Sequence, residues 1–114
     1  MVIKMKNGYK CILAIVNNGF SEEAMEAAKA CGAKGGTVLH GRGTISKEAE
    51  KMFNISIQPE KEIVMIVSSA EQKKDIMKAI MQNAGIDSKA HSLVFSLPVT
   101  DTAGFRFADT VEKD

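Results

Sequence analysis

Short runs of apolar residues along the chain predict its β-strands. The runs are rich in aliphatic and β-branched residues and have the length of strands in globular proteins. A further stretch, residues 54–58, alternates polar and apolar positions like a half-buried strand and is interrupted by Pro59. The apolar runs lie at residues 9–16 (YKCILAIV), 36–40, 61–68 (KEIVMIVS) and 92–97 (SLVFSL).

The segment after the first strand predicts a helix with recognisable ends. Ser21 is a suitable N-cap, and Phe20 before it could pack against Met25 as a hydrophobic staple. We expect the helix to run to about Cys31. It should stop at Gly32, because glycine readily adopts the left-handed conformation that ends many helices.

A second helix is predicted before the last strand. Ser69 would cap it, and Gln72 three residues later completes a capping-box pattern. Gly85 would end it. Its apolar stripe recurs at helical spacing and consists of Ile76, Met77, Ile80 and Met81.

Residues 44–60 form an excursion between two core strands that a two-residue hairpin could have joined. Within it, residues 47–53 (KEAEKMF) have helical composition but are too few for a stable isolated helix. Connections of this length usually carry a function, such as contact with a partner. The alternative is an extended hairpin that only packs within an oligomer.

The order of elements is strand, helix, strand, strand, helix, strand, which predicts an α+β fold. Two right-handed crossovers interlock as a ferredoxin-like βαββαβ sandwich, with two helices on one face of an antiparallel four-stranded sheet. We expect a single domain over residues 1–114, with its core at about 8–99 and a tail at 100–114. Pro98 would end the regular pairing of the last strand. The other sheet face would lack cover, so self-association is expected to bury it.

Composition and charge narrow the function classes. The chain has 45% hydrophobic and 25% charged residues and a net charge of +1, with both signs spread along it. A nucleic-acid surface would need clustered Lys and Arg, so no nucleic-acid partner is expected. We recognise neither a membrane-spanning run nor a signal peptide, and expect no membrane insertion and a cytoplasmic location. Cys11 and Cys31 are expected to be reduced, packed thiols.

Catalytic chemistry has little support in the sequence. His40 and His91 are the only histidines, and no nucleophile or carboxylate lies at a diagnostic spacing from either. No pattern typical of a metal site is present. We therefore expect no catalytic residue, no metal ligand and no enzyme activity. The alternative is a small ferredoxin-like enzyme that uses one of the two histidines as a general base.

The densest chemical signal is the glycine-rich run at residues 32–43 (GAKGGTVLHGRG). Glycines let backbone N–H groups approach a phosphate, and Lys34 and Arg42 would supply counter-charge. The spacing matches neither a Walker loop nor a dinucleotide fingerprint. A helix cap followed by a strand that bends at Gly41 and Gly43 explains the same glycines equally well.

These features together resemble the PII signalling family, the nitrogen regulatory protein P-II superfamily. The resemblance covers residues 9–99 and rests on the element order, the stretch 30–38 (ACGAKGGTV), the excursion, and the third and last strands. It implies a ferredoxin-like subunit of a compact homotrimer that binds adenine nucleotides in clefts between subunits. It also implies that a flexible T-loop, here the excursion, docks on a protein target such as a transporter or an enzyme of nitrogen or carbon metabolism.

The resemblance further implies a nucleotide site in this chain. Thr37 falls where the family's threonine contacts adenine, and Gly35 and Gly36 flank it. Lys47 falls near a polar residue at the base of the T-loop that can approach phosphate or metal. Further ligand contacts at that base are expected from Gly41, Arg42 and Gly43.

The chain departs from the family pattern on the phosphate side of this site. The family's B-loop, T-G-x-x-G-D-G-K, aligns with residues 84–91, where Gly85 matches, His91 replaces the lysine and Lys89 could substitute for it. The basic R-x-R pair after the last strand is missing, and the excursion is short and contains no tyrosine. From the resemblance as a whole, we expect ATP, ADP or AMP as the candidate ligands, and no required cofactor. The alternative is a protein-interaction module with no nucleotide ligand.

Overall fold

A four-stranded antiparallel sheet with the strand order β3-β4-β2-β5 forms the centre of the structure, and a three-stranded sheet with the order β6-β1-β7 lies at one end. The structure is a computed structural model that describes residues 2–5, 8–44, 46–53, 59–104 and 110–113. The elements are β1 (Val2–Met5), β2 (Lys10–Asn17), α1 (Ser21–Ala30), β3 (Thr37–Arg42), α2 (Lys47–Phe53), β4 (Glu60–Ser68), α3 (Ala70–Ala84), β5 (Leu93–Pro98), β6 (Asp101–Ala103) and β7 (Thr110–Lys113).

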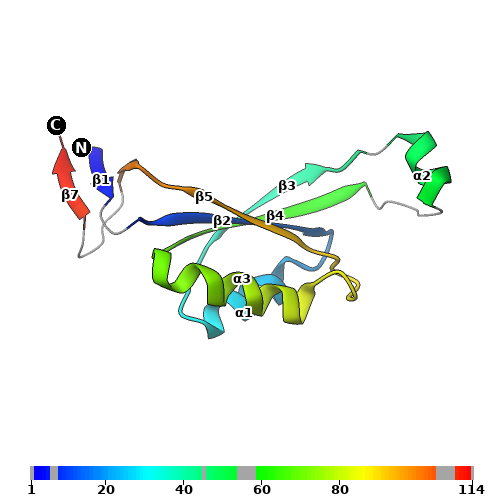
Figure 1. Cartoon of the computed structure of the whole chain (residues 1–114), viewed down its shortest axis with the longest axis horizontal. Helices are drawn as coiled ribbons and strands as arrows, with labels where there is room; N and C mark the ends of the chain where they lie inside the picture. Colours follow the sequence, from blue (N-terminus) through cyan, green and yellow to red (C-terminus); the bar gives the residue numbers. More distant parts are fainter. Residues whose placement is uncertain (1, 6–7, 45, 54–58, 105–109, 114) are drawn as a thin grey trace.

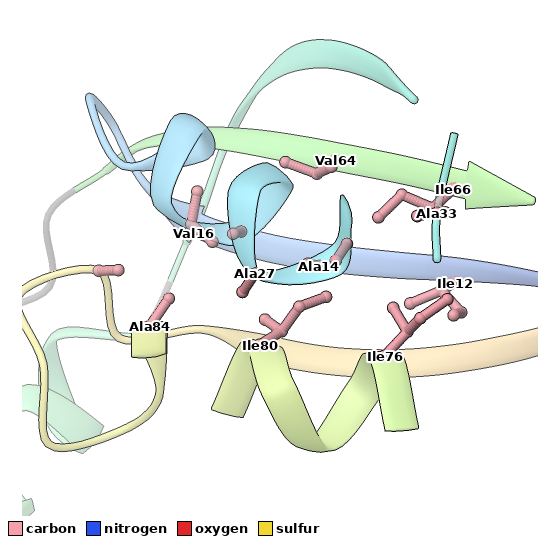
Figure 2. Close-up of a cluster of buried hydrophobic side chains, with 13 residues drawn as sticks. Ile12, Ala14, Val16, Ala27, Ala33, Val64, Ile66, Ile76, Ile80 and Ala84 are labelled. Atoms are coloured by element: carbon pink, nitrogen blue, oxygen red, sulfur yellow. The ribbon is translucent and has the colours of Figure 1, made fainter. Parts of the chain in front are cut away.

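Helices α1 and α3 pack against one face of the central sheet (Figure 1). Alternation along β2 places Ile12, Ala14 and Val16 on that face, where all three are fully buried. Because α1 contributes only alanines to the fully buried core, its axis can approach the sheet closely. Figure 2 shows the cluster in which the β2 side chains meet buried residues of β4 and the helices, among them Val64, Ile66, Ala27, Ile76, Ile80 and Ala84.

The opposite face of the central sheet carries apolar side chains that neither helix covers. Leu13 of β2 lies opposite Met65 of β4 and Phe95 of β5, so these three side chains share this face. On the edge strand β5, the exposed fractions are 61% for Leu93, 38% for Phe95 and 46% for Leu97. We call this surface the open face; the register assigns to it Leu13, Ile15, Leu39, Ile63, Met65, Val67, Leu93, Phe95 and Leu97.

The predicted ferredoxin-like fold is confirmed. Strands β2 to β5 and helices α1 and α3 follow the βαββαβ order, with both helices on one face of the antiparallel sheet. The excursion leaves the sheet between β3 and β4 and carries α2 well beyond it (Figure 1). The Cα radius of gyration is accordingly 16.0 Å, larger than the value of about 13 Å typical of a compact chain of this size.

The three-stranded sheet is not among the elements predicted from the sequence. Val2 of β1 lies opposite Ala103 of β6 and Lys113 of β7, so the sheet joins the two ends of the described chain. Its strands have only three or four residues each. Strands this short show no recognisable period, and their pairing depends on contacts between distant parts of the sequence.

Helix α1 ends as predicted but begins differently. Gly32 follows it with a φ of +103°, in the left-handed region. The N-cap is Phe20, without any side-chain capping bond, so the prediction that Ser21 caps the helix is wrong. The carboxylate of Glu62 on β4 accepts the backbone N–H groups of Gly19 and Ser21 instead.

Helix α3 begins as predicted, but its apolar stripe is narrower than expected. The Ser69 hydroxyl oxygen accepts the backbone N–H of Gln72 at 3.2 Å. Ile76 and Ile80 are fully buried, whereas the side chain of Met81 is 42% exposed. One residue step turns a helix by about 100°, which carries Met81 past the edge of the buried stripe.

Two predicted strands begin and end later along the chain than expected. Strand β3 continues through Gly41 to Arg42 alongside β4, so the two glycines do not bend it before that point. Strand β5 includes Pro98, which is tolerated because β5 lies at the sheet edge. Helix α2 coincides with the predicted helical stretch at 47–53. The predicted strand at 54–58 lies outside the described residues.

Candidate functional site

Gly35, Gly36 and Thr37 line a cavity of about 730 Å³ at one end of the central sheet. The left-handed turn at Gly32 directs the chain away from α1 and into the loop that forms one wall. The beginning of α3 forms the facing wall. Besides residues 32–37, the lining consists of Tyr9, Met65, Val67, Ser68, Ser69, Glu71 and Gln72.

Gly36 is the point at which this wall lies closest to the sheet. A Cβ atom on Gly36 would lie 2.6 Å from the Met25 Cε atom and 2.7 Å from the Met65 carbonyl oxygen. The carbonyl belongs to the backbone of β4 and cannot move aside. By contrast, nothing lies within 4 Å of a Cβ built on Gly35. The glycine at position 36 is therefore needed for packing, whereas the one at position 35 leaves open space.

The cavity combines an apolar part with polar edges. Tyr9, Met65 and Val67 supply apolar surface, and the Thr37 hydroxyl lies at the edge strand. Lys34 and Glu71 bring one charge of each sign to the rim. Thr37 pairs with Met65, which places its side chain on the same sheet side as the open face. Such a cavity suits a small ligand with an apolar body and a few polar groups.

The remaining predicted ligand residues do not line this cavity. Gly41 pairs with Lys61, which pairs with Asn17, so all three lie at the other end of the central sheet. Lys47 lies farther out in the same direction, on α2 (Figure 1). The structure thus divides the predicted site into two groups. Gly35, Gly36 and Thr37 lie at the cavity, whereas Gly41, Arg42, Gly43, Lys47, Gly85, Lys89 and His91 lie toward the opposite end.

The loop at residues 85–91 is held by its own hydrogen bonds. Ser88 Oγ donates to the Gly85 carbonyl at 2.8 Å. His91 has a φ of +48°, and its Nδ1 atom lies 3.0 Å from the Ile86 carbonyl oxygen, in hydrogen-bonding distance. The His91 ring is therefore engaged with the loop backbone at one nitrogen. Neither His91 nor His40 is among the residues that line the cavity.

Lys61 and Asn17 are polar partners at this end that sequence patterns do not reveal. The Lys61 Nζ atom donates a hydrogen bond to Asn17 Oδ1 at 2.6 Å. Asn17 Nδ2 donates in turn to the Lys89 carbonyl at 2.9 Å, which ties the loop at 85–91 to the sheet. In the sequence, Asn17 belongs to an Asn-Asn-Gly turn signal and Lys61 to a charged strand end, and neither pattern indicates that they meet.

Glu62 follows Lys61 near the beginning of β4, and its side chain lies on the helix-covered side of the sheet. Its side chain is only 9% exposed. Burial alone would raise the pKa of Glu62, but hydrogen bonds from the backbones of Gly19 and Ser21, the Ser21 hydroxyl and the charge of His40 together lower this pKa. The carboxylate therefore stays ionised and stabilises the beginning of α1.

Further features of the described residues bear on other site classes. No group of three or more His, Cys, Asp or Glu side chains in the described ranges could hold a metal ion. Cys11 and Cys31 are free and partly buried, and burial raises the pKa of the Cys11 thiol. Among the helices that the structure describes, none combines the length and apolar character needed to span a bilayer.

Comparison with known proteins places the chain in a family. The model of the nitrogen regulatory protein P-II family matches residues 9–108. The chain belongs to this family. Among solved structures, the crystal structure of Arabidopsis thaliana PII bound to citrate is similar, with 21% identity and a TM-score of 0.66 over 94% of this chain and 89% of that chain. At this identity the similarity establishes the fold. No curated protein sequence matches the chain.

Family membership settles the broad class of the protein. P-II proteins are regulatory proteins rather than enzymes, are trimeric, and act on target proteins. The prediction of a P-II-type regulatory protein is confirmed at this level.

Proposed function

We propose that this chain is the subunit of a homotrimeric regulator that binds an adenine nucleotide between subunits and acts on a target protein through the excursion. The observation that carries the proposal is the division of the candidate ligand residues between the two ends of the central sheet. Thr37 and its glycines line the cavity at one end, and the loop at 85–91 and the base of the excursion lie at the other. A single subunit cannot bring them to one small ligand.

Association through the open face would bring the two groups together. The open face carries a row of aliphatic and aromatic side chains, and the three on β5 are substantially exposed in the single chain. Contiguous apolar surface of this kind usually marks an interface. Because Thr37 lies on the same sheet side, the cavity adjoins this surface. The excursion end of a neighbouring subunit could then close the cavity.

An adenine nucleotide fits the chemistry of the two groups. The cavity offers Tyr9, Met65 and Val67 for a flat ring, and the Thr37 hydroxyl for a polar edge of that ring. The other end offers backbone N–H groups and cations for phosphate. The family's full set of phosphate contacts is not present in this sequence, so AMP and ADP are the preferred nucleotides and ATP is expected to bind no better.

The regulatory output would be a change in the excursion. Its base, at Gly41 to Lys47, belongs to the candidate phosphate side, while α2 is carried well away from the sheet (Figure 1). Met52 on α2 is 76% exposed and is available to a partner. A ligand can shift the excursion between two arrangements only as far as it binds one of them more tightly.

Calorimetry on the intact oligomer tests the ligand. Titrations with ATP, ADP, AMP, cyclic AMP and adenosine should show saturable binding of at least one, with one site per chain. Citrate should be titrated as well, because it is bound in the Arabidopsis PII structure. The nucleotide proposal is wrong if no nucleotide binds at millimolar concentration.

A partner-capture experiment tests the excursion. A variant without residues 46–58 should keep its oligomeric mass and lose binding to the target, a transporter or a metabolic enzyme. Target binding that survives this deletion would exclude the excursion as the docking element. If the full chain binds its target equally well with and without nucleotides, the protein is an interaction module without a nucleotide signal.

A further inference from the structure

We propose that Lys61 is the cation of an anion-binding subsite that takes the phosphate end of the ligand in this chain. The proposal deepens the nucleotide site proposed above and rests on it for the source of the phosphate. It assigns a role to a residue that lies outside both the glycine-rich run and the loop at 85–91.

The position of Lys61 is set by its two neighbouring strands. On β4 it lies opposite Asn17 of β2 and opposite Gly41 of β3, at the sheet end from which the excursion leaves. Lys61 therefore lies among the residues that were predicted to contact phosphate, although no sequence motif includes it.

Asn17 orients the ammonium group without neutralising it. Lys61 Nζ donates to Asn17 Oδ1 at 2.6 Å, and an amide oxygen carries no net charge. An ammonium group has three N–H donors, so two remain for a ligand. Within the described ranges, Lys61 forms no ion pair with a carboxylate. A lysine held in this way keeps its full positive charge available to an anion.

The same asparagine connects Lys61 to the loop that aligns with the family's phosphate-binding loop. Asn17 Nδ2 donates to the Lys89 carbonyl, and the Asn17 backbone N–H donates to the Ala90 carbonyl, both at 2.9 Å. At the position of the family's lysine, His91 has one ring nitrogen engaged by the Ile86 carbonyl. Lys61 thus brings a further cation next to a loop in which a histidine stands at the position of the family's lysine.

Gly43 leaves room for the aliphatic part of Lys61. A Cβ atom on Gly43 would lie 3.0 Å from the Lys61 Cε atom. The Gly43 backbone is fixed by its N–H, which donates to the Pro59 carbonyl at 2.7 Å. A side chain at position 43 would therefore press on the aliphatic part of the lysine, which would have to shift by a few tenths of an ångström. The glycine at the base of the excursion thus leaves space for Lys61 in addition to any role in bending the strand.

The nearest acidic neighbours along the strand do not occupy the lysine. Glu62 points to the helix-covered side, where its Oε1 atom accepts the N–H groups of Gly19 and Ser21. Glu60 is exposed and alternates to that same side. On the edge strand next to them, Arg42 lies opposite Glu60 and therefore on that same helix-covered side, away from Lys61.

Calorimetry at low salt with pyrophosphate, ADP and adenosine tests the subsite. The variants are Lys61→Met, Lys61→Arg and, as a matched control, Lys74→Met, which removes an exposed lysine from α3. Wild type should bind pyrophosphate, more weakly as salt rises. Lys61→Met should weaken pyrophosphate and ADP about tenfold or more, as expected for loss of a charged hydrogen-bond donor. Adenosine affinity should not change, Lys61→Arg should retain most binding, and Lys74→Met should resemble wild type.

Each other outcome overturns a defined part of the proposal. Wild type that does not bind pyrophosphate, or Lys61→Met that binds it as tightly, excludes the subsite. Loss of the oligomer in Lys61→Met, measured by light scattering, shows that the lysine serves assembly instead and also excludes it. Failure of adenosine and nucleotides to bind wild type overturns the nucleotide site, while the pyrophosphate titration still decides the role of Lys61.

Discussion

Glu62 on β4 accepts the backbone N–H of Gly19 at 2.6 Å, and through the same oxygen it accepts that of Ser21 at 3.4 Å. The first turn of a helix has N–H groups without partners inside the helix, and a negative charge there is favourable. In this chain the capping group comes from a strand 41 residues away from Ser21 instead of from the residue before the helix. The contact ties α1 to β4, the strand that begins where the excursion returns to the sheet.

Glu62→Ala should destabilise the protein. The substitution leaves the N–H groups of Gly19 and Ser21 without their acceptor, which costs roughly 1 kcal/mol for loss of a helix cap. Chemical denaturation should show a lower midpoint with an unchanged slope. Glu60→Ala removes an exposed carboxylate from the same strand and is the control. Equal unfolding free energies for the two variants would contradict the capping role.

The contribution of Glu62 should depend on pH in a defined direction. Its pKa in the folded state is below the ordinary value of 4.5, so its stabilisation is fully present above that value. As the pH falls below about 4.5 and through the lower folded-state pKa, the carboxylate is protonated and the stabilisation is lost. The difference in unfolding free energy between wild type and Glu62→Ala should shrink over this range. A difference that is constant from pH 7 to pH 3 would contradict this account.

Gly36→Ala should destabilise the protein and disturb the cavity. The new methyl group would meet the Met65 carbonyl oxygen and Met25, and overpacking of this kind costs roughly 1–3 kcal/mol. Gly35→Ala is the matched control, because open space surrounds that position. Its expected change in unfolding free energy is about 0 to 1 kcal/mol in the stabilising direction. The packing argument fails if the two variants unfold alike.

Thr37→Val tests the adenine side of the proposed site. Valine keeps the β-branched shape and strand preference of threonine and replaces only the hydroxyl group by a methyl group. We expect an about tenfold loss of affinity for the nucleotide that wild type binds best, with unchanged stability. Val38→Thr, which adds a hydroxyl on the other side of β3, should leave the affinity unchanged. Calorimetry measures both, and an unaltered affinity for Thr37→Val would remove this residue from the site.

Phe95→Glu should prevent assembly through the open face. A carboxylate on the central exposed residue of β5 would have to be buried without a partner in the interface. Light scattering should give the mass of one chain for this variant and of three for wild type. Met81→Glu changes an equally exposed apolar residue on α3 and should remain trimeric. If Phe95→Glu stays trimeric and Met81→Glu dissociates, the interface lies on the helix side.

The sequence predicted elements that depend on local patterns and missed those that depend on distant contacts. The strand at residues 9–16, the Ser69 cap and the stop at Gly32 each follow from neighbouring residues, and the structure has all three. The cap of α1 failed because its acceptor, Glu62, lies on a different strand. In the strand pattern that residue is indistinguishable from any solvated charge.

The candidate site was predictable to a similar extent. The glycine-rich run indicated where Gly35, Gly36 and Thr37 meet, and the cavity lies there. Its facing wall at the start of α3 could not be recognised, because Glu71 and Gln72 look like ordinary residues of a first helical turn. The Lys61–Asn17 pair is formed by strand register, which the sequence does not reveal in advance.

Pairing of β1 with β7 has a consequence for the order of folding. Val2 lies opposite Lys113, so this contact closes a loop that contains almost the entire chain. Closing so long a loop is entropically unfavourable until the intervening residues are ordered. During synthesis β1 emerges before β7 and can pair with it only after β7 has left the ribosome. The three-stranded sheet should therefore form last, after the amides of the central sheet are already protected from exchange. In native-state hydrogen exchange it should be the first part to open.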